Sequence, residues 1–181
     1  FELDEKRFFR FDLGAGEQIL DLTKLIESPQ FSLNGLDYAR TMATRMVNAA
    51  RMILEADDLE FDTATPAVLS QTIHKTRISS DLEMDSFGGV CYYSSVCDPD
   101  NWGVQVAING GNLVSYQTPV LIHEYLHTLQ RWSSNEYYFN NVQFIEGLTE
   151  FLARKIYYKK IGIPSPSTTY QPYVEVFSAM E

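Results

Sequence analysis

The sequence is poor in cysteine and in positive charge, and it has no long apolar run. Its two cysteines, Cys91 and Cys97, are too few for a scaffold held together by disulfides, and a chain of 181 residues can bury a core without them. In one uninterrupted strand these residues would lie about 20 Å apart, so a disulfide between them requires a turn. Two reduced thiols are the alternative.

Lysine and arginine number 14 against 24 aspartates and glutamates, which gives a formal net charge of -10. An acidic surface disfavours nucleic acid and anionic membranes as partners, whereas a neutral or basic peptide or protein substrate is easier to accommodate. No apolar run approaches the length of a transmembrane helix, so we expect no membrane span. The oligomeric state stays open.

Repeats, low-complexity tracts and long linkers are also missing, which predicts a single domain over residues 1–181. The chain begins at Phe1 with neither a methionine nor a signal peptide, so we interpret it as a processed form, an excised domain or a trimmed chain. The compartment cannot be read from such an N-terminus. A secreted or extracytoplasmic location is favoured, and whether residues precede Phe1 in the natural protein stays open.

Histidine is scarce as well, yet two of the three histidines lie four residues apart, at His123 and His127. Thr118 and Pro119 resemble an N-cap and a first helical residue, which predicts a helix from there. On a helix, residues four apart share a face, so both imidazoles can bind one metal ion. Glu124 can point at a water held by that ion, and this is the His-Glu-x-x-His pattern of zinc metallohydrolases.

A structural role is the alternative for these histidines. His123 and His127 can instead be core histidines whose ring nitrogens meet nearby carbonyl groups or carboxylates. The third histidine, His74, lies near the end of a predicted helix, where a histidine offsets the helix dipole more often than it binds a metal.

Two histidines leave a zinc ion short of ligands, so the chain must supply a third from elsewhere and leave one position for water. A second helix is predicted from a cap near Asn140 through residues 144–154. It carries Glu146 and Glu150 one turn apart beside apolar residues, and carboxylates so placed are expected to meet positive charge.

The order His123-Glu124-x-x-His127, with Glu146 after eighteen further residues, resembles the gluzincin metallopeptidases, in which a glutamate on a following helix completes the zinc site. The segment from Glu146 to Glu150 is similar to the Glu-Gly-x-x-Glu variants of the gluzincin motif. The resemblance covers about residues 104–160. It implies one catalytic zinc ion held by His123, His127 and Glu146, with Glu124 as general base and Glu150 as the carboxylate that orients His123. The third histidine of metzincins is missing after His127.

Such a mechanism usually also needs an oxyanion stabiliser, and the chain offers many tyrosines for this role. Tyr138, expected in the link between the two helices, resembles the position used in thermolysin-like enzymes. Tyr173 is the second choice, because Pro172 can start a last helix near the cleft. Tyr137, Tyr157 and Tyr170 compete, and each of the five can also be an interfacial aromatic residue.

We predict an α+β fold in which a small, mostly antiparallel sheet packs on several helices in a zincin-like arrangement. Residues 1–57 are expected to be mostly helical, after a strand or docked arm over 1–13, and residues 58–181 to carry the sheet, the active-site helix and the Glu146 helix. Helices are predicted over 17–27, 34–56 and 65–75, and strands over 57–63, 90–96 and 102–109. The last two strands should form a hairpin, and residues 104–108 should line the cleft with a free edge.

These features together predict a zinc-dependent metallopeptidase, and family precedent for a compact chain favours an endopeptidase. One alternative is a catalytically inactive zincin-fold module with a binding or regulatory role, against which the intact Glu124 argues. Another is a zinc hydrolase of a non-peptide amide or ester, because the metal chemistry is shared. A purely structural zinc site is disfavoured because such sites are usually rich in sulfur.

Overall fold

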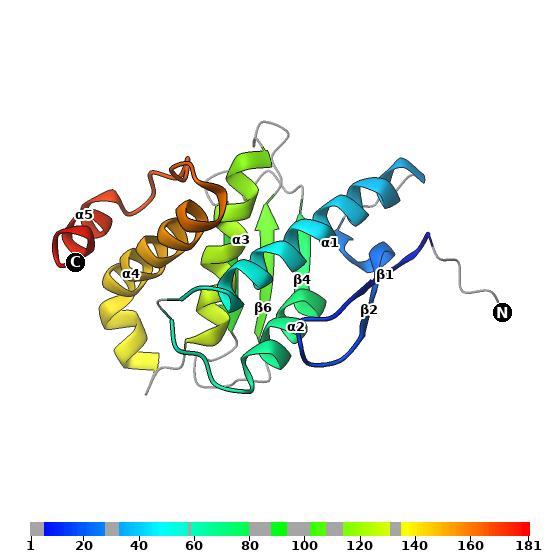
Figure 1. Cartoon of the computed structure of the whole chain (residues 1–181), viewed down its shortest axis with the longest axis horizontal. Helices are drawn as coiled ribbons and strands as arrows, with labels where there is room; N and C mark the ends of the chain where they lie inside the picture. The colour runs from blue at the N-terminus through cyan, green and yellow to red at the C-terminus, as the bar shows by residue number, and fades with distance from the viewer. Residues whose placement is uncertain are drawn as a thin grey trace.

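The computed structural model describes residues 6–27, 33–57, 59–79, 88–93, 102–107, 114–130 and 135–181 (Figure 1). Over these ranges the chain is an α+β fold in which helices dominate, as predicted. The helices are α1 (Leu33–Leu54), α2 (Thr65–Lys75), α3 (Val114–Leu129), α4 (Asn135–Ile161) and α5 (Gln171–Ala179). The strands are β1 (Phe8–Phe11), β2 (Gln18–Asp21), β3 (Ile26–Glu27), β4 (Thr76–Ser79), β5 (Gly89–Tyr93) and β6 (Trp102–Ala107), with a 3-10 turn, η1 (Leu22–Lys24).

The main sheet has four strands in the order β3-β4-β6-β5. Strand β4 runs parallel to both β3 and β6, and only β5 is antiparallel to its neighbour. The prediction of a mostly antiparallel sheet is therefore wrong for this sheet, because helical connections such as α1 and α2 between β3 and β4 return the chain in the same direction. A separate two-stranded antiparallel sheet joins β1 to β2.

Strand β5 lies at one edge of the main sheet and packs against α3. It pairs with β6 in the predicted hairpin, with Cys91 opposite Val104, while residues 94–101 lie outside the described part. The prediction that residues 104–108 present a free edge of the sheet is wrong, because β6 lies between β4 and β5. The short strand β4 follows α2 directly and pairs with the other edge of β6. It was not predicted from the sequence.

Two predicted elements near the N-terminus are also wrong. Residues 17–27 form β2, η1 and β3 rather than a helix. Ile19, Leu22 and Ile26 have a helical spacing, but Ile19 is exposed and the buried residues are Leu20, Leu22 and Leu25. No strand forms in the described part of residues 57–63. There the Asp62 carboxylate accepts hydrogen bonds from the Ala64 N–H and the Thr65 hydroxyl, which turns the chain into α2.

Helix α3 occupies the centre of the molecule. It packs against α1, α2, α4 and both strands of the hairpin, while α5 packs on the outer side of α4 (Figure 1). Leu121, Ile122 and Tyr125 of α3 are fully buried, and α1 contributes a long buried stripe that includes Met42 and Met46. Helix α3 is therefore covered on most of its surface, so a buried polar group on it needs a partner.

Both helices of the predicted site begin earlier than expected. Helix α3 starts at Val114, so Pro119 lies inside it rather than at its first position. Helix α4 starts at Asn135 rather than near Asn140, with the acidic residue Glu136 in its first turn, where the helix dipole favours negative charge. Tyr138 therefore lies on α4 and not in a link between helices.

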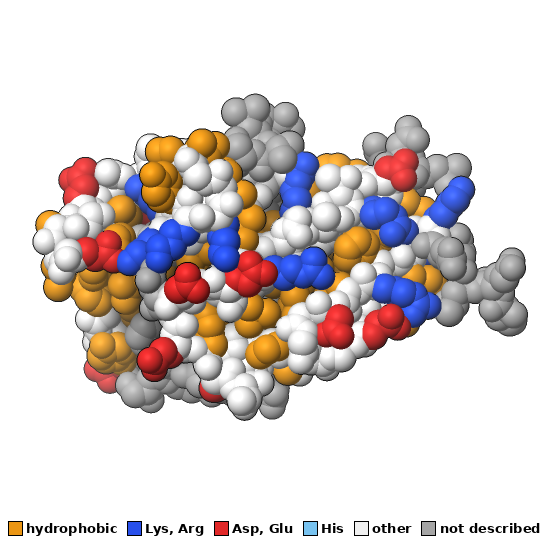
Figure 2. All heavy atoms as spheres, in the orientation of Figure 1, with side chains coloured by type: hydrophobic (Ala, Val, Ile, Leu, Met, Phe, Trp, Pro, Cys, Tyr) orange, Lys and Arg blue, Asp and Glu red, His pale blue; other side chains and the backbone are white. Residues whose placement is uncertain are grey.

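Basic and acidic side chains lie beside one another on the face of the molecule drawn in Figure 2. The excess of acid is therefore not gathered into one large patch on that face. Among the helices of the described ranges, none is both long enough and apolar enough to cross a membrane.

Candidate metal centre

Helix α3 places His123 and His127 one turn apart inside the molecule, where they are 7% and 5% exposed. Their rings meet edge to face with centroids 4.8 Å apart, and the two Nε2 atoms are 3.1 Å apart. Ring nitrogens that face each other so closely indicate a shared cation or proton between them, because two lone pairs repel.

Glu146 reaches the same point from α4, which packs against α3. Its Oε2 atom lies 3.0 Å from His123 Nε2 and 3.1 Å from His127 Nε2. Three donor atoms from two helices thus form a nearly equilateral triangle, and they belong to the three residues that the gluzincin resemblance implies as ligands. This is the group of described residues that fits a metal ion.

The size of this triangle can be compared with a zinc site. Zinc binds histidine nitrogen and carboxylate oxygen at about 2.0–2.2 Å, so two ligands at tetrahedral positions lie roughly 3.3–3.5 Å apart. The sides of the triangle here are 3.0–3.1 Å, so a small outward movement of each side chain opens it to that size. Two imidazoles and one carboxylate are also a ligand set that zinc hydrolases use.

Hydrogen bonds behind the histidines orient both rings. His123 Nδ1 lies 2.9 Å from Oε2 of Glu150, the residue predicted for this role. His127 Nδ1 lies 3.0 Å from Oε1 of Gln130, whose amide nitrogen in turn donates to the Thr149 hydroxyl at 2.7 Å. Both acceptors require an Nδ1–H, so each Nε2 can direct a lone pair into the triangle.

Gln130 was missed by the sequence analysis. It follows His127 by three residues at the end of α3, so the chain turns its amide back onto the ring. Only the spacing to His127 could have indicated this contact, and such a spacing is common in helices without any function.

The electrostatics of the cluster favour a positive charge. Burial lowers the pKa of His123, but hydrogen bonds to Glu146 and Glu150 outweigh burial and raise this pKa to about 10. Burial raises the pKa of Glu146, yet hydrogen bonds to His123 and His127 lower it overall. The carboxylates around the triangle therefore favour a positive charge there, which a divalent cation would supply.

Glu124 lies beside the triangle but is not one of its corners. It is 6% exposed. Burial raises its pKa, while the charges of His123 and His127 and a backbone hydrogen bond from Cys91 act in the opposite direction. A carboxylate with a raised pKa next to a metal-bound water suits a general base, which must accept a proton and then release it.

Strand β5 can approach Glu124 so closely because residue 89 is glycine. A Cβ atom on Gly89 would lie 2.7 Å from Val120 Cγ1 and 2.9 Å from Glu124 Cγ, closer than real Cβ atoms come to other atoms. Gly88 meets a similar restriction from Val120 and Tyr116. The glycine pair is therefore what lets the edge strand lie against α3.

A cavity of about 230 Å³ opens over the triangle. Its walls are Gly88 and the β5 residues Gly89–Cys91, the α3 residues around Glu124, and the C-terminal segment that carries Ser167 and Tyr170. Cys91 is half-buried in this wall, and Cys97 lies outside the described residues, so a disulfide between them stays untested.

The structure separates the five candidate tyrosines. Of these five, only Tyr138 and Tyr170 line the cavity. The Tyr138 hydroxyl donates to Glu146 Oε1 at 3.4 Å, and the Tyr170 ring stacks on His123 with centroids 6.2 Å apart. The Tyr173 hydroxyl instead donates to the exposed Gln143, so the structure does not bring this second choice to the cavity. Tyr137 is exposed, and Tyr157 is buried in the core.

Burial and the charge of Glu146 raise the pKa of Tyr138 and Tyr170, that of Tyr170 to about 12. Both hydroxyl groups therefore stay protonated and can donate hydrogen bonds near neutral pH. His74 lies elsewhere, with Nε2 3.2 Å from Gln18 Oε1 and its ring against Phe11, so the structure does not bring it to the triangle.

No family model, curated protein or solved structure matches this chain. The zincin-like arrangement and the gluzincin resemblance therefore remain predictions, and any function must be inferred from the geometry of the site.

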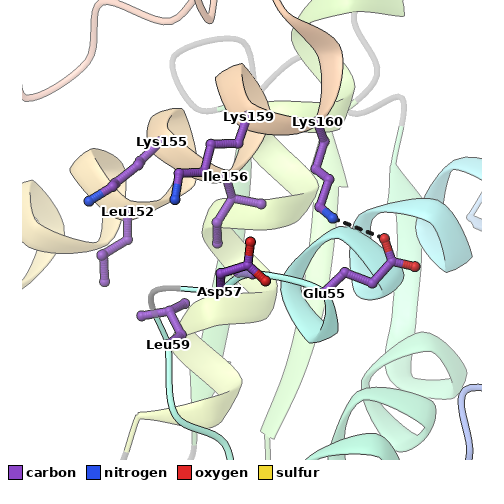
Figure 3. A pocket seen from close by; sticks show the side chains of 9 residues that line it. Glu55, Asp57, Leu59, Leu152, Lys155, Ile156, Lys159 and Lys160 are labelled. Carbon is purple, nitrogen blue, oxygen red and sulfur yellow. Dashed lines mark hydrogen bonds and ion pairs between the residues drawn. The ribbon is translucent and has the colours of Figure 1, made fainter.

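A second cavity, also of about 230 Å³, lies between the end of α1 and the C-terminal half of α4 (Figure 3). Lysine amino groups and two carboxylates surround an apolar floor of Leu152, Ile156 and Leu59. Lys160 Nζ donates to Glu55 Oε2 at 3.1 Å, so a basic and an acidic side chain of this cavity form an ion pair with each other. The two cavities have the same volume, and only the first brings histidines and buried carboxylates together.

Proposed function

We propose that this chain is a zinc-dependent metallopeptidase of gluzincin type. The observation that carries the proposal is the triangle of His123 Nε2, His127 Nε2 and Glu146 Oε2, with sides of 3.0–3.1 Å, beside the separate buried carboxylate of Glu124. A structural site would not need an adjacent base, and a cluster of satisfied core histidines would not need all three donors to converge.

A zinc ion in this triangle would polarise a water molecule and the scissile carbonyl group. Glu124 takes a proton from the water as the water oxygen bonds to the carbonyl carbon. The C–N bond then breaks as Glu124 passes this proton to the departing amine. Glu150 and Gln130 keep the imidazole rings aimed at the triangle during these steps.

The substrate class follows from the edge strand. Strand β5 ends the sheet order and lines the cavity, so an extended peptide can add to its outer edge through main-chain hydrogen bonds. Such pairing holds a peptide beside Glu124, and the hydroxyl groups of Tyr138 and Tyr170 offer donors for the oxygen of the scissile carbonyl.

The decisive experiment combines a metal assay with a peptide assay. Wild-type protein should bind about one zinc ion and cleave members of a diverse peptide library, and a chelator should stop this cleavage. Glu124→Gln should keep the zinc and lose at least about a hundredfold in turnover, because the general base is gone while the ligands remain.

Glu136→Gln is the matched control, since Glu136 is an exposed carboxylate at the start of α4, and it should behave as wild type. An active Glu124→Gln protein would refute the mechanism. Intact peptides across the library with zinc bound would favour an inactive binding module, and cleavage of esters alone would favour a non-peptide hydrolase.

A further inference from the structure

One face of α4 carries a row of four residues, Gln143, Gly147, Glu150 and Arg154. Their spacing of four, three and four residues places them on the same side of the helix. After α4 the chain turns back, and α5 lies along α4 (Figure 1). All four residues contact the returning segment, residues 165–173, which we call the C-terminal wall.

Arg154 joins α4 to the C-terminal wall by two hydrogen bonds. Its Nη1 donates to Gln171 Oε1 and its Nη2 to the Thr169 carbonyl oxygen, both at 2.6 Å. Its Nε donates to Glu150 Oε1 at 2.7 Å. The other oxygen of Glu150 is the partner of His123, so one guanidinium joins the wall to the group that orients a histidine.

Gly147 allows the wall to lie close to α4. A Cβ atom on Gly147 would overlap the Cβ of Tyr173 and would come within 2.8 Å of its Cγ. The Tyr173 hydroxyl donates to Gln143 Oε1 at 2.8 Å one turn earlier. The glycine between Glu146 and Glu150 is therefore a packing position in this chain.

These contacts determine where Tyr170 lies. Its backbone is left-handed, with φ 55° and ψ 26°, a conformation that is unfavourable for a residue with a side chain and needs support from its surroundings. In this conformation its ring is nearly parallel to that of His123, with an angle of 13° between them. Ser167, which is buried in the same wall, hydrogen-bonds to Glu150.

We propose that Gly147 and Arg154 are positioning residues that clamp the C-terminal wall onto α4. The clamp holds Tyr170 over the cavity and thereby determines which substrate side chains fit beside the triangle. This inference rests on the proposed peptidase function for its substrate consequence, whereas the clamp itself can be measured without activity.

The first measurement is amide hydrogen exchange of residues 165–179 in the metal-free protein. Arg154→Met removes the three hydrogen bonds and should raise exchange there about tenfold or more, while the amides of α3 keep their protection. Arg154→Lys retains the charge beside Glu150 but cannot span to Thr169 and Gln171, so it should give an intermediate rise. Arg51→Met, at an exposed arginine of α1, is the control and should leave exchange unchanged.

Gly147→Ala should raise exchange as well, because the new methyl group pushes Tyr173 away. In a Tyr173→Gly background the overlapping Cβ is gone, so adding Gly147→Ala should then cause no further rise. Additive effects of the two changes would overturn the packing role of Gly147.

The second measurement is the peptide kinetics of the zinc-loaded variants. A displaced wall should raise KM about tenfold and should alter the order of preference among peptides, and kcat should fall as well because the Tyr170 hydroxyl moves with the wall. Unchanged exchange in Arg154→Met and Gly147→Ala overturns the clamp. Raised exchange with an unchanged KM and unchanged preference among peptides overturns the role of the clamp in substrate fit. If the wild-type protein has no peptidase activity, the peptidase function is rejected, but the exchange result still tests the clamp. If the other variants do not fold, Arg154→Lys still tests the part of the clamp made by Arg154, and unchanged exchange in this variant overturns that part.

Discussion

Tyr138 and Tyr170 both line the cavity, but they contact the site in different ways. The Tyr138 hydroxyl donates a hydrogen bond to the proposed zinc ligand Glu146, whereas the Tyr170 ring stacks on the ring of His123. The first contact bears on the metal, and the second leaves the hydroxyl to act on a substrate. Single Tyr→Phe changes remove only an oxygen atom and so separate the two roles.

We expect Tyr170→Phe to lower kcat by about ten- to a hundredfold with unchanged zinc affinity, because a donor to the oxyanion is lost and the ring stack remains. Tyr138→Phe should weaken zinc binding by no more than about tenfold, because the lost hydrogen bond is long at 3.4 Å. Steady-state kinetics and competition with a chromophoric chelator measure both. Tyr158→Phe, at an exposed position on α4, is the control. A larger loss of kcat in Tyr138→Phe than in Tyr170→Phe would reverse the assignment.

The four residues named from the sequence as ligands and base come together because most of the needed information is local. A helix fixes His123 and His127 on one face, and the Glu-Gly-x-x-Glu spacing fixes Glu150 relative to Glu146. Tyr170 could not be chosen over Tyr173 in this way. The position of the Tyr170 ring depends on the left-handed backbone of Tyr170 itself and on contacts between the C-terminal wall and α4, which are distant in sequence.

At the scale of elements, the position of β5 decides how a substrate can approach. Strand order depends on pairing between distant segments, so local patterns predicted the hairpin but not which of its strands lies at the edge. The four residues of β4 are too few to show an alternating pattern, and without them β6 looks like an edge strand. The helices were easier to predict, since α1 and α2 carry long periodic stripes and a proline at the start of α2.

The close approach of β5 to α3 leads to a prediction at Gly89. Gly89→Ala should lower kcat by about ten- to a hundredfold while zinc stays bound, because its methyl group displaces either the strand or the Glu124 side chain. Val120→Ala removes the nearest of the atoms that the methyl group would meet, so the double variant should recover part of the loss. Val120→Ala alone is the matched control. Full activity in Gly89→Ala would show that β5 does not position the base or the substrate.

At the scale of the whole molecule, the metal triangle joins two helices that are already packed in a continuous core. Buried side chains of α1, α2, α3 and α4 form one hydrophobic cluster that extends to the sheet. The ligands also satisfy each other by hydrogen bonds without a metal. The metal-free protein should therefore be folded, and zinc should add to its stability without being required for folding.

This leads to a prediction about metal removal. A ligand that binds only the folded state stabilises it by RT ln(1 + [L]/Kd), which is about 4 kcal/mol at a thousandfold excess over Kd. For a domain of this size that corresponds to a rise of roughly 10 °C in Tm. Thermal unfolding at a series of free zinc concentrations should show this rise in wild-type protein, and a chelator should reverse it. Glu146→Gln should flatten the dependence because a ligand is lost, whereas Glu136→Gln should retain it. A wild-type Tm that does not respond to zinc would mean that the triangle binds no zinc, and the peptidase proposal would fail with it.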